Sequence, residues 1–239
     1  MREEGLARLS DVHIPRNNAD YIVMHYLIDA LKMAINKYAK GNVLDIGCGN
    51  KPYELFFKDK IYSYTGCDVI QSDKNKVDVI CEATKLAFAD EKFDTVFSTQ
   101  VIEHVSDPFK MLQEANRVLK NDGLIIVSAP FCWELHEEPY DFYRYSKYGL
   151  KAMFEQKGFE VLEITANGGK WAAIFQMNIN MVYSTFKTRK WPIRILKGIF
   201  INLHFTALLN RFALWADKRF HDELLTLNYV VIARKIKNV

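Results

Sequence analysis

The sequence contains few of the residues and patterns that mark secreted, disordered or membrane-spanning chains. Only four cysteines occur in 239 residues and none forms a Cys-x-x-Cys pair, so neither a disulfide framework nor a zinc site is predicted. There are only 11 glycines and 6 prolines, and 49% of the residues are apolar, which excludes a disordered chain. Residues 1–10 have no apolar core, so we expect no signal peptide and a cytoplasmic protein.

A strong charge of either sign is also missing. The formal net charge is +3, which is too small to indicate nucleic-acid binding by itself, so we expect no DNA partner. The length is sufficient for one α/β core with additions. Short apolar runs alternate with helix-like segments, which is typical of a mostly parallel sheet covered on both faces.

The run at residues 43–50 carries the most information. An apolar strand end leads into Asp45 and then into Gly47 and Gly49. Glycine is needed where the backbone turns sharply and approaches a ligand closely. A strand, a glycine turn and a following short helix form the ligand crevice of a doubly wound sheet. A dinucleotide fingerprint has a third glycine where this chain has Pro52, so an adenosyl ligand without phosphates fits better.

Further segments follow in a fixed order. The apolar run at 62–67 ends in Asp68, at the distance from the glycine turn where a carboxylate binds a ribose diol. A third short strand leads into Glu82 and Ala83, and two further apolar strands are expected at 93–98 and 124–129. The order and spacing predict one continuous crevice.

In this order, residues 41–165 resemble the class I S-adenosylmethionine-dependent methyltransferases. The resemblance implies a Rossmann-like, doubly wound, seven-stranded, mostly parallel sheet with helices on both faces. It also implies an antiparallel last strand and S-adenosyl-L-methionine as cofactor. The segment after the fourth strand lacks the Asn/Asp-Pro-Pro-Tyr/Phe signature of related enzymes, which disfavours methylation of nucleobase amines or glutamine side chains.

The resemblance implies a role for each cofactor residue. Asp45 would orient the loop and meet the methionine ammonium, and Asp68 would accept both ribose hydroxyls. Glu82 would face the adenine amine, with the Ala83 amide near a ring nitrogen, although aspartate is usual at the position of Glu82. Alone, each acid could equally be a helix cap or a solvated surface group. The remaining cofactor-binding candidates are Gly47, Cys48, Gly49, Val69 and Thr99.

The transfer of a methyl group requires no particular type of catalytic residue. The methyl group on a sulfonium is already activated, so the enzyme mainly aligns the reactants. A hydroxyl or amine nucleophile must also lose a proton. His104 follows the fourth strand near the expected methyl position and is one candidate base. The alternative is that His104 holds its loop in place.

The segment at 136–145 is the most unusual part of the chain. It resembles a subgroup of bacterial methyltransferases linked to surface-glycan or lipid-linked sugar metabolism. His136 and Asp141 are candidate bases or substrate ligands, and Tyr140, Tyr143 and Arg144 are candidate substrate-binding residues. The alternative is a structural loop with Arg144 paired to Asp141. No metal is predicted, because the spacing matches no metal-binding motif.

The chain is predicted to have four parts. These are an N-terminal helical segment (1–40), the cofactor-binding core (41–170), a helical insert (171–226), and the final strand with a tail (227–239). Residues 187–220 of the insert carry eight Lys or Arg and one acid, among aromatic residues. We consider a lid, a homodimer surface, or peripheral contact with the inner face of a membrane, but no spanning helix.

Three functions are compatible with the sequence. The first is methylation of a hydroxyl or carboxyl on a small or lipid-linked acceptor, with a sugar as one candidate. The second is methylation of a protein or RNA partner docked by the basic insert. The third is a binding protein that keeps the adenosyl pocket without catalysis, against which the intact loop acids and glycines argue.

Overall fold

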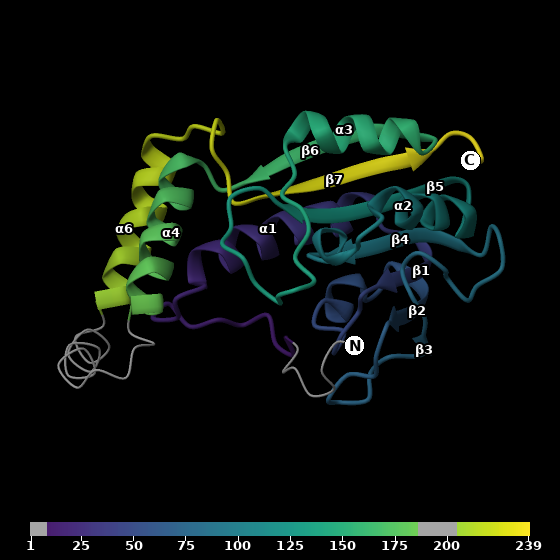
Figure 1. The fold of residues 1–239 in the computed structure, drawn as a ribbon, viewed down its shortest axis with the longest axis horizontal. Helices are drawn as coiled ribbons and strands as arrows, with labels where there is room; N and C mark the ends of the chain where they lie inside the picture. The colour runs from purple at the N-terminus through teal and green to yellow at the C-terminus, as the bar shows by residue number, and fades with distance from the viewer. Residues whose placement is uncertain (1–8, 186–204) are drawn as a thin grey trace.

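The structure is a computed structural model that describes residues 9–185 and 205–239 (Figure 1). Its strands are β1 (Gly41–Ile46), β2 (Ile61–Asp68), β3 (Val79–Ile80), β4 (Phe93–Thr99), β5 (Leu119–Pro130), β6 (Phe159–Asn167) and β7 (Asn228–Lys235). Its α-helices are α1 (Tyr21–Tyr38), α2 (Pro108–Val118), α3 (Lys147–Gln156), α4 (Lys170–Thr185) and α6 (Phe205–Arg219). Two short 3-10 helices are η1 (Glu54–Phe57) and η2 (Ile102–His104).

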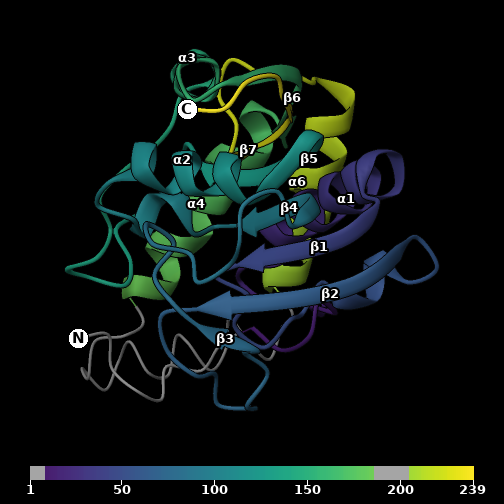
Figure 2. The same cartoon turned by 90° about the vertical axis from the view of Figure 1, so that its right-hand side faces the viewer.

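The strands form one seven-stranded sheet in the order β3-β2-β1-β4-β5-β7-β6. The pairs from β3 to β5 are parallel, whereas β7 runs antiparallel to both β5 and β6. Figure 2 shows β1 and β2 side by side and pointing the same way. The predicted doubly wound sheet with an antiparallel last strand is therefore confirmed.

Each central strand packs two different layers of helices, because successive side chains point to opposite faces. Val43 and Phe97 pack with α1, whereas Leu44 and Val96 pack with α2 and α3 on the other face. The helices α1 and α3 accordingly lie on opposite sides of β6 and β7 (Figure 1). Both faces are buried, which explains why these strands read as short apolar runs rather than as alternating patterns.

The helix α1 begins at Tyr21 with Asp20 at the N-cap position, and no side chain caps it. The Asn18 side chain instead accepts the Asp20 backbone N–H at 2.8 Å. The local turn before the helix thus uses the asparagine side chain that could have capped it.

The helices α4 and α6 lie side by side at one end of the molecule (Figure 1). Asp217 on α6 is fully buried and accepts the backbone N–H groups of Gly169 at 2.9 Å and Ala172 at 3.0 Å. The Tyr26 hydroxyl of α1 donates to the same carboxylate at 2.8 Å. One carboxylate therefore joins α6 to the beginning of α4 and to α1.

Part of the predicted insert lies outside the described residues. This applies to residues 186–204, which include Arg189, Lys190, Arg194 and Lys197. Among the described helices, none is long and apolar enough to cross a membrane. The division of the chain at residues 40, 170 and 226 remains a prediction.

Candidate active site

A cavity of about 820 Å³ opens at the carboxyl ends of β1, β2 and β4. This is the switch point of the sheet, where the chain leaves β1 in one direction and β4 in the other. Predicted site residues that line the cavity are Gly47, Asp68, Val69, Glu82, Ala83, His104 and Tyr140. Lining residues that the sequence analysis did not name include Ile70, Thr84, Gln100, Val101 and Ser106.

The glycine turn forms one wall of this cavity. The backbone N–H groups of Gly47 and Cys48 both donate to the Cys67 carbonyl, at 2.8 and 3.0 Å, which holds the turn against β2. Gly47 has a φ of +74°, and a Cβ there would lie 2.3 Å from a methyl carbon of Val101. Only glycine fits this position without displacing the cavity wall.

Cys48 and Thr99 do not line the cavity. The Cys48 side chain is buried against β2, since a Cβ on Gly66 would lie 2.6 Å from its sulfur. Burial raises the pKa of this thiol. Thr99 hydrogen-bonds to Tyr53. Contact of either residue with a cofactor therefore remains a prediction, with the backbone of Cys48 as the part within the turn.

The two acids of the turn region are held differently. Asp68 accepts the backbone N–H groups of Gly49 at 3.1 Å and Val69 at 2.7 Å, which fixes its carboxylate at the cavity wall. Asp45 lies behind the turn and accepts the Tyr64 hydroxyl at 2.6 Å. Burial raises the pKa of Asp45 to about 7. A cation arriving beside Asp45 would favour its ionised form.

Tyr64 was not named in the sequence analysis, because its place beside Asp45 follows from the pairing register of β1 and β2. Val43 pairs with Tyr64 and Asp45 pairs with Gly66 across the parallel strands β1 and β2. Alternation therefore places Tyr64 on the same face as Asp45. The register was needed to see this, and the sequence alone does not contain it.

The segment at 132–145 is organised around the pair of Arg144 and Asp141. The guanidinium donates to both carboxylate oxygens, at 2.6 and 2.7 Å, and also to the carbonyl groups of Trp133 and Glu134. The His136 backbone N–H donates to Asp141 at 2.9 Å. Arg144 lowers the pKa of Asp141 to about 2. This geometry favours a positioning role for Asp141 over that of a base.

Two tyrosines of this segment lie differently around the cavity. Tyr140 lines it, and its carbonyl oxygen lies 2.8 Å from His104 Nδ1. Tyr143 instead donates its hydroxyl to the Ser106 carbonyl at 2.9 Å. The segment is thereby fastened to the residues that follow β4.

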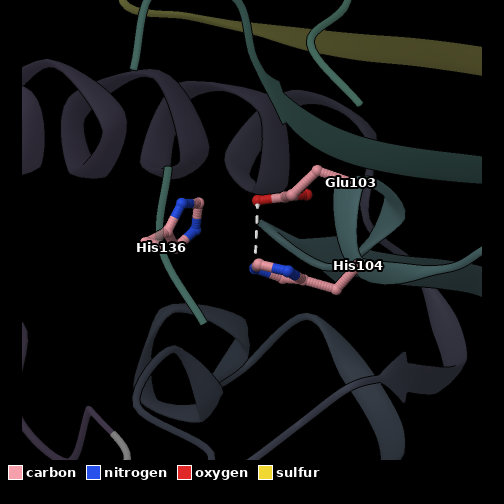
Figure 3. A group of neighbouring side chains, drawn as sticks. All are labelled: Glu103, His104 and His136. Atoms are coloured by element: carbon pink, nitrogen blue, oxygen red, sulfur yellow. Dashed lines mark ion pairs between the residues drawn. The ribbon is translucent and has the colours of Figure 1, made fainter. Parts of the chain in front are cut away.

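Glu103, His104 and His136 come together where these two segments meet (Figure 3). The His104 Nε2 and Glu103 Oε1 atoms are 3.8 Å apart, and the two imidazole rings are 4.7 Å apart between centroids. Glu103 is fully buried, and neither of its carboxylate oxygens has a hydrogen-bond partner among the described residues. Burial raises the pKa of Glu103 to about 8.

Comparison with known proteins agrees with the fold. Residues 44–127 match the methyltransferase domain family. An uncharacterised protein of Methanocaldococcus jannaschii is 35% identical over 121 residues, which cover 46% of this chain and 56% of that protein. A ubiquinone biosynthesis O-methyltransferase of Azorhizobium caulinodans is 31% identical over 125 residues, covering 46% and 47%. The chain thus spans about half the length of these curated relatives.

A solved S-adenosylmethionine-dependent methyltransferase from Archaeoglobus fulgidus superposes with a TM-score of 0.56 at 17% identity, covering 87% of this chain and 93% of that one. Residues 44–127 thus match a methyltransferase domain, and the sheet order and topology are those of the solved methyltransferase fold. The cofactor that the matched domain implies is S-adenosyl-L-methionine.

The residues present fit this cofactor. Gly47 adopts a φ of +74° that a side chain would strain, and both Gly47 and Asp68 line the cavity. Glu82 and Ala83 lie at the wall beyond β3. When bound, the cofactor supplies a methyl group on a positively charged sulfur. Asp45, Asp68 and Glu82 are the acids that we expect to hold its ammonium, ribose and adenine groups.

Proposed function

We propose that this chain transfers a methyl group from S-adenosyl-L-methionine to a hydroxyl or carboxyl oxygen of a small or lipid-linked acceptor, with a sugar as one candidate. The observation that carries the proposal is that His104 lines the same cavity as Asp68, with its ring oriented by the Tyr140 carbonyl. An imidazole that can accept a proton therefore lies in the same crevice that we expect to bind the cofactor. The relative named as an O-methyltransferase supports an oxygen acceptor.

We assign different roles to the other residues of the site. His104 and His136 are the candidate proton acceptors, since imidazole titrates near neutral pH. Asp141 and Arg144 hold His136 and the loop that carries it. Tyr140 forms a wall for the acceptor. Alignment of the acceptor oxygen with the methyl carbon would then account for most of the reduction in the activation barrier.

A lipid-linked acceptor is favoured by an aromatic surface on α4 and α6. Phe212 and Trp215 of α6, and Phe220 directly after it, are each about half exposed, and the Trp215 ring contacts the other two rings. Trp171 and Phe175 of α4 extend the same surface. Exposed aromatic groups beside Lys218 and Arg219 are typical of a helix at a membrane interface. We propose peripheral contact with the inner face of a membrane, in a cytoplasmic protein.

Sedimentation with vesicles tests the membrane part of the proposal. We expect binding to anionic vesicles that weakens with salt, because each basic group near an anionic surface contributes about 1 kcal/mol. The variants are Trp215→Ser and a chain with Arg189, Lys190, Arg194 and Lys197 neutralised. Sedimentation that depends neither on lipid charge nor on either variant would favour a lid or a homodimer surface. The size of the protein in solution would then distinguish a lid from a homodimer.

The function itself is tested by methyl transfer from labelled cofactor into a cell extract. The extract is separated into lipid, glycan, protein and RNA fractions, and an Asp68→Ala variant serves as the matched control. We expect label in the lipid or glycan fraction with the wild type only. Label confined to protein or RNA would support the alternative of a macromolecular partner. Cofactor binding without any labelled fraction would support a binding protein.

A further inference from the structure

The group of Glu103, His104 and His136 has a geometry that methyl transfer alone does not require. One ligand atom from each side chain lies within 4.8 Å of the others. Glu103 and His104 come from the segment after β4, whereas His136 comes from the loop after β5 (Figure 3). Two imidazoles and one carboxylate are a donor set that divalent transition metals prefer.

Both histidines are held so that the nitrogen facing the group can bind a metal. His104 Nδ1 lies 2.8 Å from the Tyr140 carbonyl, which places the proton on Nδ1 and the lone pair on Nε2. His136 Nδ1 lies 3.3 Å from Asp141 Oδ2 and 3.3 Å from the Glu134 carbonyl. Arg144 Nη2 is 3.4 Å away but already donates to Asp141. Acceptors behind metal-binding histidines fix the tautomer in this way.

Glu103 supplies an independent observation. Its side chain is 0% exposed, and both oxygens lack a hydrogen-bond partner among the described residues. A buried carboxylate without partners is costly, so such groups are rare unless a ligand satisfies them. Arg144 offsets part of the local charge, but Asp141 and Glu137 add to it. The neighbourhood therefore favours an additional cation.

We propose that Glu103, His104 and His136 bind one divalent transition-metal ion, with open coordination positions facing the acceptor end of the cavity. Zinc, manganese or iron suit this donor set, whereas magnesium and calcium prefer oxygen ligands only. The proposal rests on the proposed function and narrows its acceptor class to oxygen compounds that coordinate a metal.

With His104 and His136 bound to the ion, the ion would take over from these two side chains the task of promoting loss of the acceptor proton. A metal-bound hydroxyl loses its proton more easily, so the acceptor O–H bond breaks with release of the proton to water. The acceptor oxygen then forms a bond to the methyl carbon as the carbon–sulfur bond breaks. The electron pair of that bond stays on sulfur, which loses its positive charge.

Titration of metal-stripped full-length protein tests the site. Zn²⁺ and Mn²⁺ are titrated by calorimetry, and Co²⁺ is followed by its visible absorption. We expect saturable binding of one ion per chain, weakened at least about tenfold in both Glu103→Gln and His136→Ala. His25→Ala is the matched control, since His25 also lies beside an acid, Asp29 at 3.7 Å, but on the surface of α1. That variant should bind metal as the wild type does.

Two results would overturn the proposal. One is wild-type protein, folded by circular dichroism, that shows no saturable binding. The other is binding unchanged in both variants. If Glu103→Gln does not fold, His136→Ala decides, because His136 lies partly exposed in a loop. Calorimetry with S-adenosyl-L-methionine on the same samples separates the two proposals. Cofactor binding without metal binding would refute the metal site and would leave the proposed function unaffected.

Discussion

The two ends of the crevice are built in different ways. At the cofactor end the wall is a backbone turn, and Asp68 is fastened by two backbone N–H groups. At the end where we propose the acceptor, His104 and Tyr140 line the wall from two distant segments. Glu103, next to His104, is buried and has no hydrogen-bond partner among the described residues. The first end is complete before a ligand arrives, whereas the second contains polar groups that a ligand would satisfy.

The largest expected effect concerns the ion pair that organises the acceptor end. Arg144→Met leaves the Asp141 carboxylate, whose side chain is 1% exposed, without its main partner. We expect a loss of about 3–5 kcal/mol in the free energy of unfolding, because breaking a buried pair strands one charge. Urea denaturation measures this loss. The control is Arg234→Met, whose pair with Glu160 is exposed and screened by solvent, so that its loss should change the free energy of unfolding little. Equal losses would contradict the comparison.

A second prediction separates the acceptor end from the cofactor end by function. His136→Ala and Asp141→Ala should each lower turnover about 100-fold, the usual contribution of a group that moves or positions a proton. Cofactor affinity should stay within about threefold, because both side chains lie outside the cofactor wall. Turnover is measured on the labelled fraction and affinity by calorimetry. If only His104→Ala abolishes turnover, the segment at 136–145 is structural.

The third prediction concerns the cofactor end. Asp68→Ala should weaken cofactor binding by about 1.5–3 kcal/mol, the usual loss when hydrogen bonds to a charged acceptor are removed. Calorimetry with S-adenosyl-L-methionine and with NAD measures this, and we expect no gain of NAD binding. Glu155→Ala, an exposed acid on α3, is the control. Unchanged affinity in the Asp68 variant would refute the assignment of Asp68 to the ribose.

The smallest effect is a pH dependence of cofactor affinity. Burial raises the pKa of Asp45 to about 7, and only its ionised form attracts the methionine ammonium. Affinity should therefore rise roughly fivefold to tenfold between about pH 6 and 7.5, where an α-ammonium remains largely charged. Calorimetry across this range should show the rise in the wild type and a flat profile in Asp45→Asn. A wild-type affinity that does not change with pH would contradict the assignment of Asp45 to the methionine ammonium.

The sequence was sufficient to predict most strands of the sheet, and the differences between the predicted and observed strands have local causes. The strands β1, β4, β5 and β7 read as apolar runs because both of their faces are mostly buried. The short third strand, β3, has only two residues, Val79 and Ile80. The strand β5 begins at Leu119 rather than near 124, since Leu119 already pairs with Phe93. A turn-like sequence ending in Gly123 concealed this early start.

The acceptor end was less predictable for a reason that lies in tertiary structure. The orientation of His104 depends on a carbonyl 36 positions away, at Tyr140. The meeting of Glu103 with His136 depends on how two loops fold over the sheet. Residue type and spacing marked His104 and His136 as candidates, but no local pattern distinguishes a solvated Glu103 from a buried one without partners.

The buried carboxylate of Asp217 has a consequence for the architecture of the chain. It binds the beginning of α4 and the hydroxyl of Tyr26, which lies in the helix that covers the sheet. The helices α4 and α6 are therefore not structurally independent of the rest of the domain. A protein engineer who moved residues 171–226 onto another domain of this fold would need to carry a matching tyrosine. One who deleted them would leave the amide group of Gly169 and the Tyr26 hydroxyl to find water instead.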